Sequence, residues 1–251
     1  MSIGEVLSIA LAGLAAGTIN TLVGSGTLIT FPVLLAFGYP PVTANVSNTI
    51  GLVPGSVSGA IGYRRELTGQ GGRVMRLGAM SVLGGVTGAV LLLVLPASAF
   101  KAIVPVFIAI ALALVVFQPR LNDWLLRREV DMRREGGALT ALAVCATGVY
   151  GGYFGAAQGI LLLGILGVAL SQDLQRTNAL KNVLAGMVNG VAGVYFALAA
   201  HVEWAPAGII AGASIVGAQL GARYGRRLEP RPLRAIIVVV GILAIVRLLV
   251  T

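Results

Sequence analysis

A glycine-rich interruption between two apolar segments decides the fold. Residues 16–32 read Ala16-Gly-Thr-Ile-Asn-Thr-Leu-Val-Gly-Ser-Gly-Thr-Leu-Ile-Thr-Phe-Pro32. The apolar run 4–22 ends at the glycines of 24–26, and the apolar segment 27–37 that follows is closed by Gly38-Tyr-Pro-Pro41. At the rise of an α-helix this second segment covers about 16 Å, roughly half of a hydrocarbon core. The pattern therefore predicts a short, broken helix inside a membrane protein.

The composition of the whole chain excludes an ordinary soluble protein. Of its 251 residues, 57% are hydrophobic and 11% are charged, whereas soluble domains carry about 25% charged residues. We therefore expect an all-α integral membrane protein. The single cysteine, Cys145, allows neither an intrachain disulfide nor a thiolate cluster. Because the sequence also lacks metal-binding, phosphate-binding and nucleophile motifs, we expect no cofactor and no enzyme activity.

The charged residues mark the loops. No charged side chain lies between Glu5 and Arg64, and arginine-rich loops occur near 64–76, 120–134 and 223–234. By the positive-inside rule these loops are cytoplasmic, so the net charge of +9 indicates membrane orientation rather than nucleic-acid binding. With the broken segments, about 8–10 transmembrane elements are expected. The apolar runs between the loops predict helices at 74–95, 100–117, 137–154, 175–199, 205–222 and 234–250.

The two halves of the chain resemble each other. Matching pairs are Gly17/Gly148 and Gly24/Gly155, 131 positions apart, and Thr43/Thr177, Asn48/Asn182 and Gly59/Gly193, 134 positions apart. We therefore predict a first repeat at 1–117 and a second at 137–251. An amphipathic cytoplasmic linker at 118–136 would join them, for which an ordinary charged loop is the alternative.

The repeats are expected to be inverted. The helix after Thr43 ends at a basic, inside loop, whereas the helix after Thr177 ends at His201, in a turn predicted to lie outside. Inverted repeats are typical of secondary transporters, which bind their substrate near the midplane between the repeats.

The second repeat has a matching break at 151–159, followed by the short apolar segment 160–170. Broken backbone persists in a membrane only beside a cavity or other protein groups. A half-helix N-terminus also offers free N–H groups and the positive end of a dipole, which suit an anion. The alternative is that the glycines serve close helix packing alone.

Polar residues around the two breaks supply the candidate substrate site. Each of them also suits an interhelical hydrogen bond, but the cluster as a whole favours a polar ligand. Lys181 is a charged residue well inside a predicted helix, and it either neutralises an anionic substrate or snorkels to the surface. The candidate substrate-binding residues are Asn20, Thr21, Gly24, Ser25, Gly26, Thr27, Asn45, Asn48, Gly155, Gln158, Asn178, Lys181 and Asn182.

Residues 16–32, the Pro40-Pro41 step, Ala44-Asn-Val-Ser-Asn48 and Tyr63-Arg64-Arg65 together resemble the TauE/SafE family of sulfite and organosulfonate exporters. Residues 151–155 and 177–182 resemble the second repeat of that family, so the resemblance covers nearly the whole chain. It implies export of a small anion, such as sulfite or a sulfonate, across the inner membrane.

These observations predict a multi-pass transporter of the inner (plasma) membrane that moves a small anion by alternating access. An anion channel and a non-transport membrane scaffold are the alternatives. The expected partners are the anionic substrate and the lipid bilayer, with no nucleic acid. The sequence leaves open a homodimer, and also whether the short helices cross the membrane or re-enter.

Overall fold

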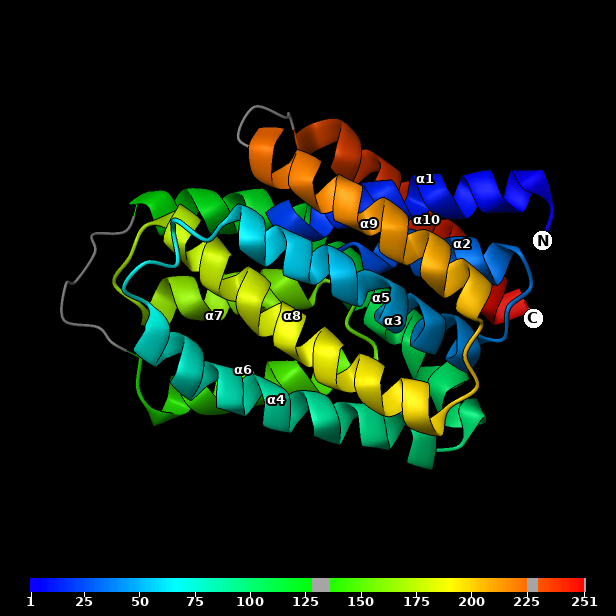
Figure 1. Ribbon diagram of the computed structural model, residues 1–251, viewed down its shortest axis with the longest axis horizontal. Coiled ribbons are helices and arrows are strands. Elements are labelled where there is room, and N and C mark those ends of the chain that lie inside the picture. Colours follow the sequence, from blue (N-terminus) through cyan, green and yellow to red (C-terminus); the bar gives the residue numbers. More distant parts are fainter. Residues whose placement is uncertain (128–135, 225–229, 251) are drawn as a thin grey trace.

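The computed structural model describes residues 1–127, 136–224 and 230–250 (Figure 1). The predicted fold class is confirmed, because these residues form helices and no strand. Five of the described helices are long and apolar enough to cross a membrane. In chain order the helices are α1 (Ile3–Leu22), α2 (Thr27–Ala36), α3 (Pro41–Gly62), α4 (Gly71–Val94), α5 (Ala97–Arg127), α6 (Ala138–Tyr153), α7 (Gln158–Ala169), α8 (Leu174–Ala199), α9 (Trp204–Tyr224) and α10 (Pro230–Val250).

The two short helices, α2 and α7, turn back beside the helices that precede them. The hydroxyl of Tyr39, just after α2, donates a 2.7 Å hydrogen bond to Oε1 of Glu5 at the start of α1. In the second half, Gly136 before α6 lies against Leu170 at the end of α7. Each pair is therefore an antiparallel hairpin. Its outer ends, which are the start of the long helix and the end of the short one, lie at the same end of the bundle, and the break between the two helices forms its tip.

Helices α3 and α8 cross the molecule in opposite directions. Next to the start of α8, Arg176 Nη2 donates to Thr68 O at 2.8 Å, and Gln70 Nε2 donates to Arg176 O at 3.1 Å. At the other end, the backbone N–H of Glu203, after α8, donates to Ser47 Oγ on α3 at 2.9 Å. The end of each helix therefore lies beside the start of the other.

Helix contacts occur in matched sets across the two halves of the chain. Helix α1 packs on α9 and α6 on α4, α3 packs on α9 and α8 on α4, and α2 contacts α10 as α7 contacts α5. Adding five to each helix number, with the count continuing at α1 after α10, turns each contact into its counterpart in the other half. This pattern supports the predicted duplication. The inverted placement of the two repeats in a membrane stays a prediction.

Glycines let the long helices approach until backbone meets backbone. A Cβ added to Gly217 on α9 would lie 2.0 Å from Leu14 O on α1. A Cβ added to Gly88 on α4 would lie 2.0 Å from Val149 O on α6. Small residues at such crossings are a common basis of helix association in membranes. The packing interpretation therefore holds for these two interfaces, whereas the glycines at the helix breaks need a separate account.

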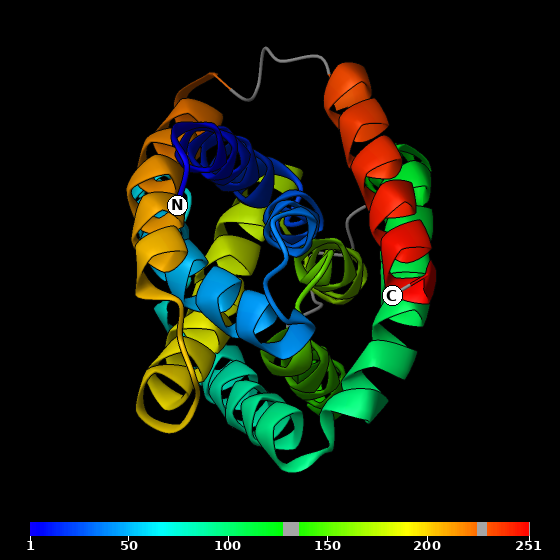
Figure 2. The same ribbon diagram turned by 90° about the vertical axis from the view of Figure 1, so that its right-hand side faces the viewer.

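The short helices occupy the centre of the bundle. Viewed along the molecule, α2 and α7 are surrounded by the longer helices, with α5 and α10 side by side at one flank (Figure 2). The ring of Phe31 on α2 packs edge-on against Phe154 at 5.2 Å and against Phe100 at 6.4 Å between centroids. These contacts join the first short helix to the second break, through Phe154, and to the start of α5, through Phe100.

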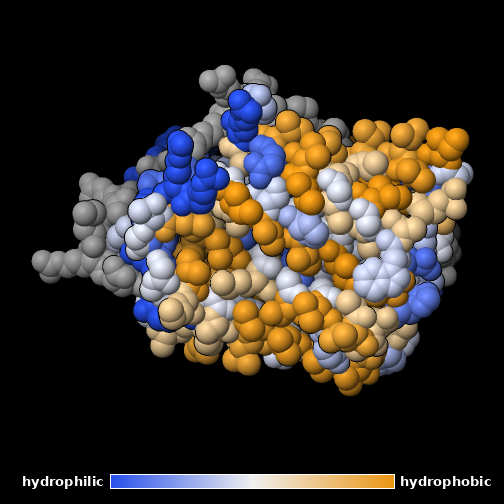
Figure 3. All heavy atoms as spheres, viewed as in Figure 1, coloured by the Kyte–Doolittle hydropathy of each residue, from blue (hydrophilic) through white to orange (hydrophobic). Residues whose placement is uncertain are grey.

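Apolar side chains cover much of the outer surface. Figure 3 shows hydrophobic residues along the bundle and hydrophilic ones gathered at the end that carries the turn after α3 and the start of α8. Leu198 and Leu139 are 83% and 81% exposed, as expected for side chains that face lipid. The separation of charge from the apolar flank supports the prediction that the basic loops lie on one side of a membrane.

Helix α5 is longer than predicted. The sequence predicts a helix end at 117, but α5 continues through Pro119 to Arg127, so part of the expected linker is helical. The extension packs against α7, where Leu121 and Leu125 cover Gly164 and Gly167. Residues 128–135 of the expected linker lie outside the described residues.

Candidate substrate-binding site

The tips of the two hairpins meet through glycine backbone. The N–H of Gly159, at the start of α7, donates a 3.1 Å hydrogen bond to the carbonyl of Gly24, in the break after α1. A Cβ on Gly24 would lie 2.3 Å from the Cα of Gly159, and a Cβ on Gly159 would lie 2.4 Å from the Cα of Gly24. Gly24 also has a φ of +84°, which favours glycine. Both positions therefore need a residue without a side chain.

The C-terminal ends of α1 and α6 are capped from the opposite half of the chain. Asn178 and Asn182 on α8 each donate through Nδ2 to the carbonyl of Thr21, at 3.1 and 3.2 Å. Asn45 on α3 donates through Nδ2 to the carbonyl of Tyr153 at 3.0 Å. The last carbonyls of a helix have no partner within the helix, and buried carbonyls need one. Each long helix therefore stabilises the break of the other repeat.

Lys181 belongs to the same capping cluster. Its Nζ donates to the carbonyls of Asn20 and Thr21 at 3.0 and 3.4 Å, and its side chain is 0% exposed. Its Cδ would lie 3.2 Å from a Cβ on Gly159. The side chain thus runs from the second break to the end of α1 and does not reach the surface, which excludes the snorkelling alternative.

The first break is also held by groups of its own repeat. The N–H of Gly26 donates to Asn20 Oδ1 at 2.9 Å. Asn48 on α3 donates through Nδ2 to Thr27 Oγ1 at 3.4 Å, and its Oδ1 accepts from the hydroxyl of Thr30. Asn48 therefore makes the interhelical hydrogen bonds that the sequence offered as the alternative to ligand binding.

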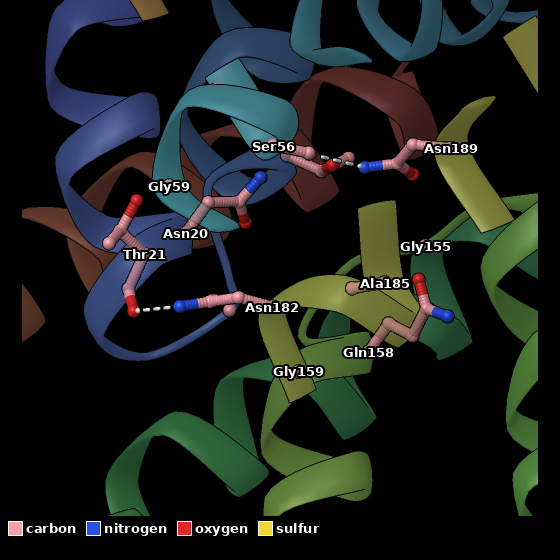
Figure 4. Close-up of a pocket in the computed structure, with 12 residues that line it drawn as sticks. Asn20, Thr21, Ser56, Gly59, Gly155, Gln158, Gly159, Asn182, Ala185 and Asn189 are labelled. Carbon is pink, nitrogen blue, oxygen red and sulfur yellow. Dashed lines mark hydrogen bonds between the residues drawn. The ribbon is translucent and has the colours of Figure 1, made fainter. Parts of the chain in front are cut away.

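A small cavity lies where the two breaks meet α3 and α8 (Figure 4). About 30 Å³ of it can be reached by the centre of a water molecule. Because one water needs about 10–15 Å³ by this measure, the cavity accommodates about two water-sized groups. Its lining residues are Asn20, Thr21, Gly24, Thr27, Ser56, Gly59, Gly155, Gln158, Gly159, Asn182, Ala185 and Asn189.

Gln158 is a lining residue with a buried, unused donor. Its side chain is 3% exposed, and among the described residues its Nε2 has no hydrogen-bond partner. The amide lies over Gly151, where a Cβ would approach its atoms to about 2.3–2.4 Å. A buried amide without a partner costs free energy, so the position favours a ligand that accepts a hydrogen bond.

A wide basic cleft opens at the charged end of the bundle. It has a volume of about 530 Å³, and its lining includes three arginines, Arg73, Arg76 and Arg176, and one acid, Asp173. Arg73 Nη1 donates to Gln172 Oε1 at 2.7 Å. Arg176 precedes Asn182 by six residues on α8, a rise of about 9 Å. The cleft therefore lies along the same helix as the cavity.

Comparison with known proteins identifies the family. The family model for the sulfite exporter TauE/SafE matches residues 9–248. The chain belongs to the TauE/SafE family. A probable membrane transporter protein ORF9 from Sinorhizobium sp is 31% identical over 242 residues, which cover 95% of this chain and 90% of that protein. The resemblance of the sequence to this family is thereby confirmed.

Two further relatives carry similar names. The probable membrane transporter protein YfcA from Escherichia coli (strain K12) is 28% identical over 85% of this chain and 76% of its own length. A probable membrane transporter protein from Haemophilus influenzae is 28% identical over 84% of this chain and 81% of its own length. No solved structure matches the chain. Together with the apolar helices, these relatives indicate a multi-pass membrane protein of a transporter family.

In this TauE/SafE protein the predicted site residues fall into two groups. Those that line the cavity are Asn20, Thr21, Gly24, Thr27, Gly155, Gln158 and Asn182. Those that lie outside its lining are Ser25, Gly26, Asn45, Asn48, Asn178 and Lys181. Most of the second group make hydrogen bonds that stabilise the breaks or cap helix ends. The exception is Ser25, whose buried hydroxyl has no hydrogen-bond partner among the described residues.

The list of candidate substrate-binding residues predicted from the sequence leaves out five residues that line the cavity, which are Ser56, Gly59, Gly159, Ala185 and Asn189. Asn189 Nδ2 donates to Ser56 Oγ at 3.2 Å, which joins α8 to α3 beside the cavity. Asn189 lies in an apolar stretch two turns after Asn182, and that polar residue is the signal that could have extended the site.

Proposed function

We propose that this protein carries a small anion of the sulfite class across the plasma membrane, in the export direction. The observation that carries the proposal is the cavity between the two breaks, which is lined by Gln158, a residue whose buried Nε2 has no hydrogen-bond partner among the described residues. The amides of Asn20 and Asn182 line the same cavity. Amide donors in a low-dielectric interior suit a ligand rich in acceptor oxygens.

The size of the cavity bears on the substrate. A space for about two water-sized groups suits an inorganic oxyanion after small side-chain movements, whereas a larger organic sulfonate requires the hairpin tips to separate. Lys181 does not line the cavity, but its Nζ contacts the carbonyl of the lining residue Asn20, so a protonated Lys181 would add positive charge near the site. We therefore expect sulfite to bind more tightly than organosulfonates.

Alternating access would use the contact between the hairpin tips. The outer ends of the α1–α2 hairpin lie at one end of the bundle and those of the α6–α7 hairpin at the other end. The tips of the two hairpins are joined by the hydrogen bond from Gly159 to Gly24. Rocking of one half against the other would open the cavity toward one end at a time. The basic cleft that includes Arg176 would be the cytoplasmic entrance, where positive charge raises the local anion concentration.

The test is anion binding and flux with a matched pair of variants. Gln158→Leu removes the unused donor, and we expect sulfite affinity to fall about 10–100-fold, as for a lost hydrogen bond to a charged group. Gln118→Leu is the control, because Gln118 is also a buried glutamine, with an Oε1 that has no partner in the described part of the chain, but lies outside the cavity lining. Asn182→Ala should weaken binding as well.

The outcomes separate the proposed transporter from its alternatives. Saturable sulfite flux with counterflow in proteoliposomes supports a carrier, whereas flux that rises linearly with concentration indicates a channel. Equal flux with and without the protein would indicate a scaffold. Equal sulfite affinity in Gln158→Leu and Gln118→Leu would refute the assignment of the cavity as the anion site.

A further inference from the structure

The C-terminal end of α1 is a cluster of carbonyl oxygens turned toward α8. The carbonyls of Asn20 and Thr21 accept hydrogen bonds from Lys181, and the carbonyl of Thr21 also accepts from Asn178 and Asn182. The last carbonyls of a helix carry the negative end of its dipole, which favours a cation. The cation at this helix end is the side chain of Lys181, which comes from α8 in the other repeat.

The amino group of Lys181 is held without a carboxylate partner among the described residues. Its side chain is 0% exposed, and within the part of the chain that the structure describes no carboxylate pairs with it. A buried charge needs compensating dipoles or a partner. Here the compensation comes from carbonyl dipoles at a helix end, which is the environment that broken-helix transporters use to coordinate Na⁺.

One buried oxygen on the neighbouring turn of α8 is unused. Asn178 is 6% exposed, and among the described residues its Oδ1 has no hydrogen-bond partner. A hard monovalent cation takes backbone carbonyl and amide oxygens as ligands. The carbonyls of Asn20 and Thr21 therefore supply two ligands for such a cation, and because Nδ2 of Asn178 contacts the carbonyl of Thr21, a flip of this amide would bring Oδ1 there as a third.

We propose that the C-terminal end of α1 is a binding site for a monovalent cation, and that the ammonium of Lys181 occupies it as a tethered cation. The wild-type protein accordingly needs no free Na⁺ at this place. Removal of the lysine opens a site that takes Na⁺ or Li⁺. This inference concerns a cation site and stands apart from the identity of the transported anion.

The repeat supplies the substitution for the test. The offset of 134 that pairs Asn48 with Asn182 pairs Ser47 with Lys181. Lys181→Ser therefore installs the residue that the first repeat carries at the matching position. It removes the charge and leaves space and a hydroxyl oxygen for an alkali cation. Lys181→Met fills the same space without a charge or an oxygen ligand.

The experiment measures the Tm of purified full-length protein in NaCl, LiCl or choline chloride at equal ionic strength. We expect the Tm of Lys181→Ser to rise saturably, by about 5 °C, as Na⁺ or Li⁺ replaces choline, because a bound ligand stabilises the folded state. Wild type, Lys181→Met and the matched control Lys101→Ser, at an exposed lysine on α5, should show no such rise.

Two results would overturn the proposal, and neither depends on anion transport. The first is a Lys181→Ser protein that responds to Na⁺ and Li⁺ no more than wild type does. The second is a saturable Na⁺ stabilisation of the wild-type protein, because a site filled by Lys181 has no room for a free ion. A saturable Na⁺ stabilisation of wild type would refute the proposal even if Lys181→Ser does not fold.

Discussion

The contact between the hairpin tips makes a sharp prediction about Gly159. In Gly159→Ala the new methyl group would lie 2.4 Å from the Cα and 3.2 Å from the O of Gly24, and 3.2 Å from Cδ of Lys181. Carbon atoms pack best at about 3.5–4.0 Å, so the two backbones must separate by about 1 Å. No rotamer change relieves the clash, because the nearest atoms belong to backbone.

The cost follows from two effects. Overpacking of this kind costs about 1–3 kcal/mol. Separation of the tips also weakens the hydrogen bond from Gly159 to Gly24, which contributes about 0.5–1.5 kcal/mol. Alanine regains up to about 1 kcal/mol through its helix propensity. The net destabilisation is therefore about 1–3 kcal/mol, which lowers the Tm of a chain of this length by about 3–10 °C.

The assay is thermal unfolding in detergent, followed by intrinsic fluorescence of the two tryptophans. Gly190→Ala on α8 is the matched control, because a Cβ at Gly190 meets nothing within 4 Å. Its Tm should rise by about 2–4 °C through helix propensity alone. A Tm of Gly159→Ala at or above that of wild type, with the expected rise in Gly190→Ala, would refute the contact between the tips.

Two further predictions concern the ends of the molecule. Burial and the hydrogen bond to Glu5 raise the pKa of Tyr39 to about 12 from an ordinary value of 10.0. The protonated hydroxyl of Tyr39 therefore contributes fully to the stability of the fold below pH 10, and this contribution is lost as the pH rises toward 12. Tyr39→Phe should therefore unfold at a lower temperature than wild type at pH 8, and the gap should close above pH 11; a gap independent of pH would contradict this. At the other end, Arg176→Gln should raise the KM for anion flux about threefold at low ionic strength, with a smaller effect at 0.15 M salt, where the screening length is about 8 Å. An increase that does not depend on salt would contradict a role in electrostatic attraction.

Much of the fold follows from the distribution of charge and glycine in the sequence. The absence of charge between Glu5 and Arg64 indicates membrane helices, and in the structure the hydrophilic residues that are described gather at one end of the bundle. The repeat offset places Gly24 and Gly155 in equivalent breaks, and both have positive φ. These features depend on residue type and spacing, which the sequence states directly.

The direction of the short helices and the targets of polar side chains could not be predicted in this way. Length shows that α2 is too short to cross a membrane, but the return of α2 toward Glu5 depends on the turn at the break and on Tyr39. A lysine side chain can reach in several directions, so the sequence does not reveal that Lys181 caps α1. The extension of α5 past Pro119 likewise depends on tertiary contacts with the glycines of α7.

The two breaks differ chemically although they share one pattern, and the difference explains where the cavity forms. In the first repeat Asn48 is held by Thr27 and Thr30 on α2. The offset of 131 that pairs the breaks pairs Thr27 with Gln158 and Thr30 with Leu161, so the second short helix carries no matching hydroxyls.

Asn182, the counterpart of Asn48, therefore has no threonine to bond in its own repeat. It turns to the carbonyl of Thr21 at the end of α1 and lines the cavity. Gln158 stands where the first repeat has Thr27, and its longer side chain leaves Nε2 unpartnered among the described residues. The first break, whose polar side chains bond one another, thus differs from the second, which has an unused donor, because Gln158 and Leu161 stand where the first repeat has Thr27 and Thr30. A duplicated chain of this kind would hold one anion site between its repeats rather than two.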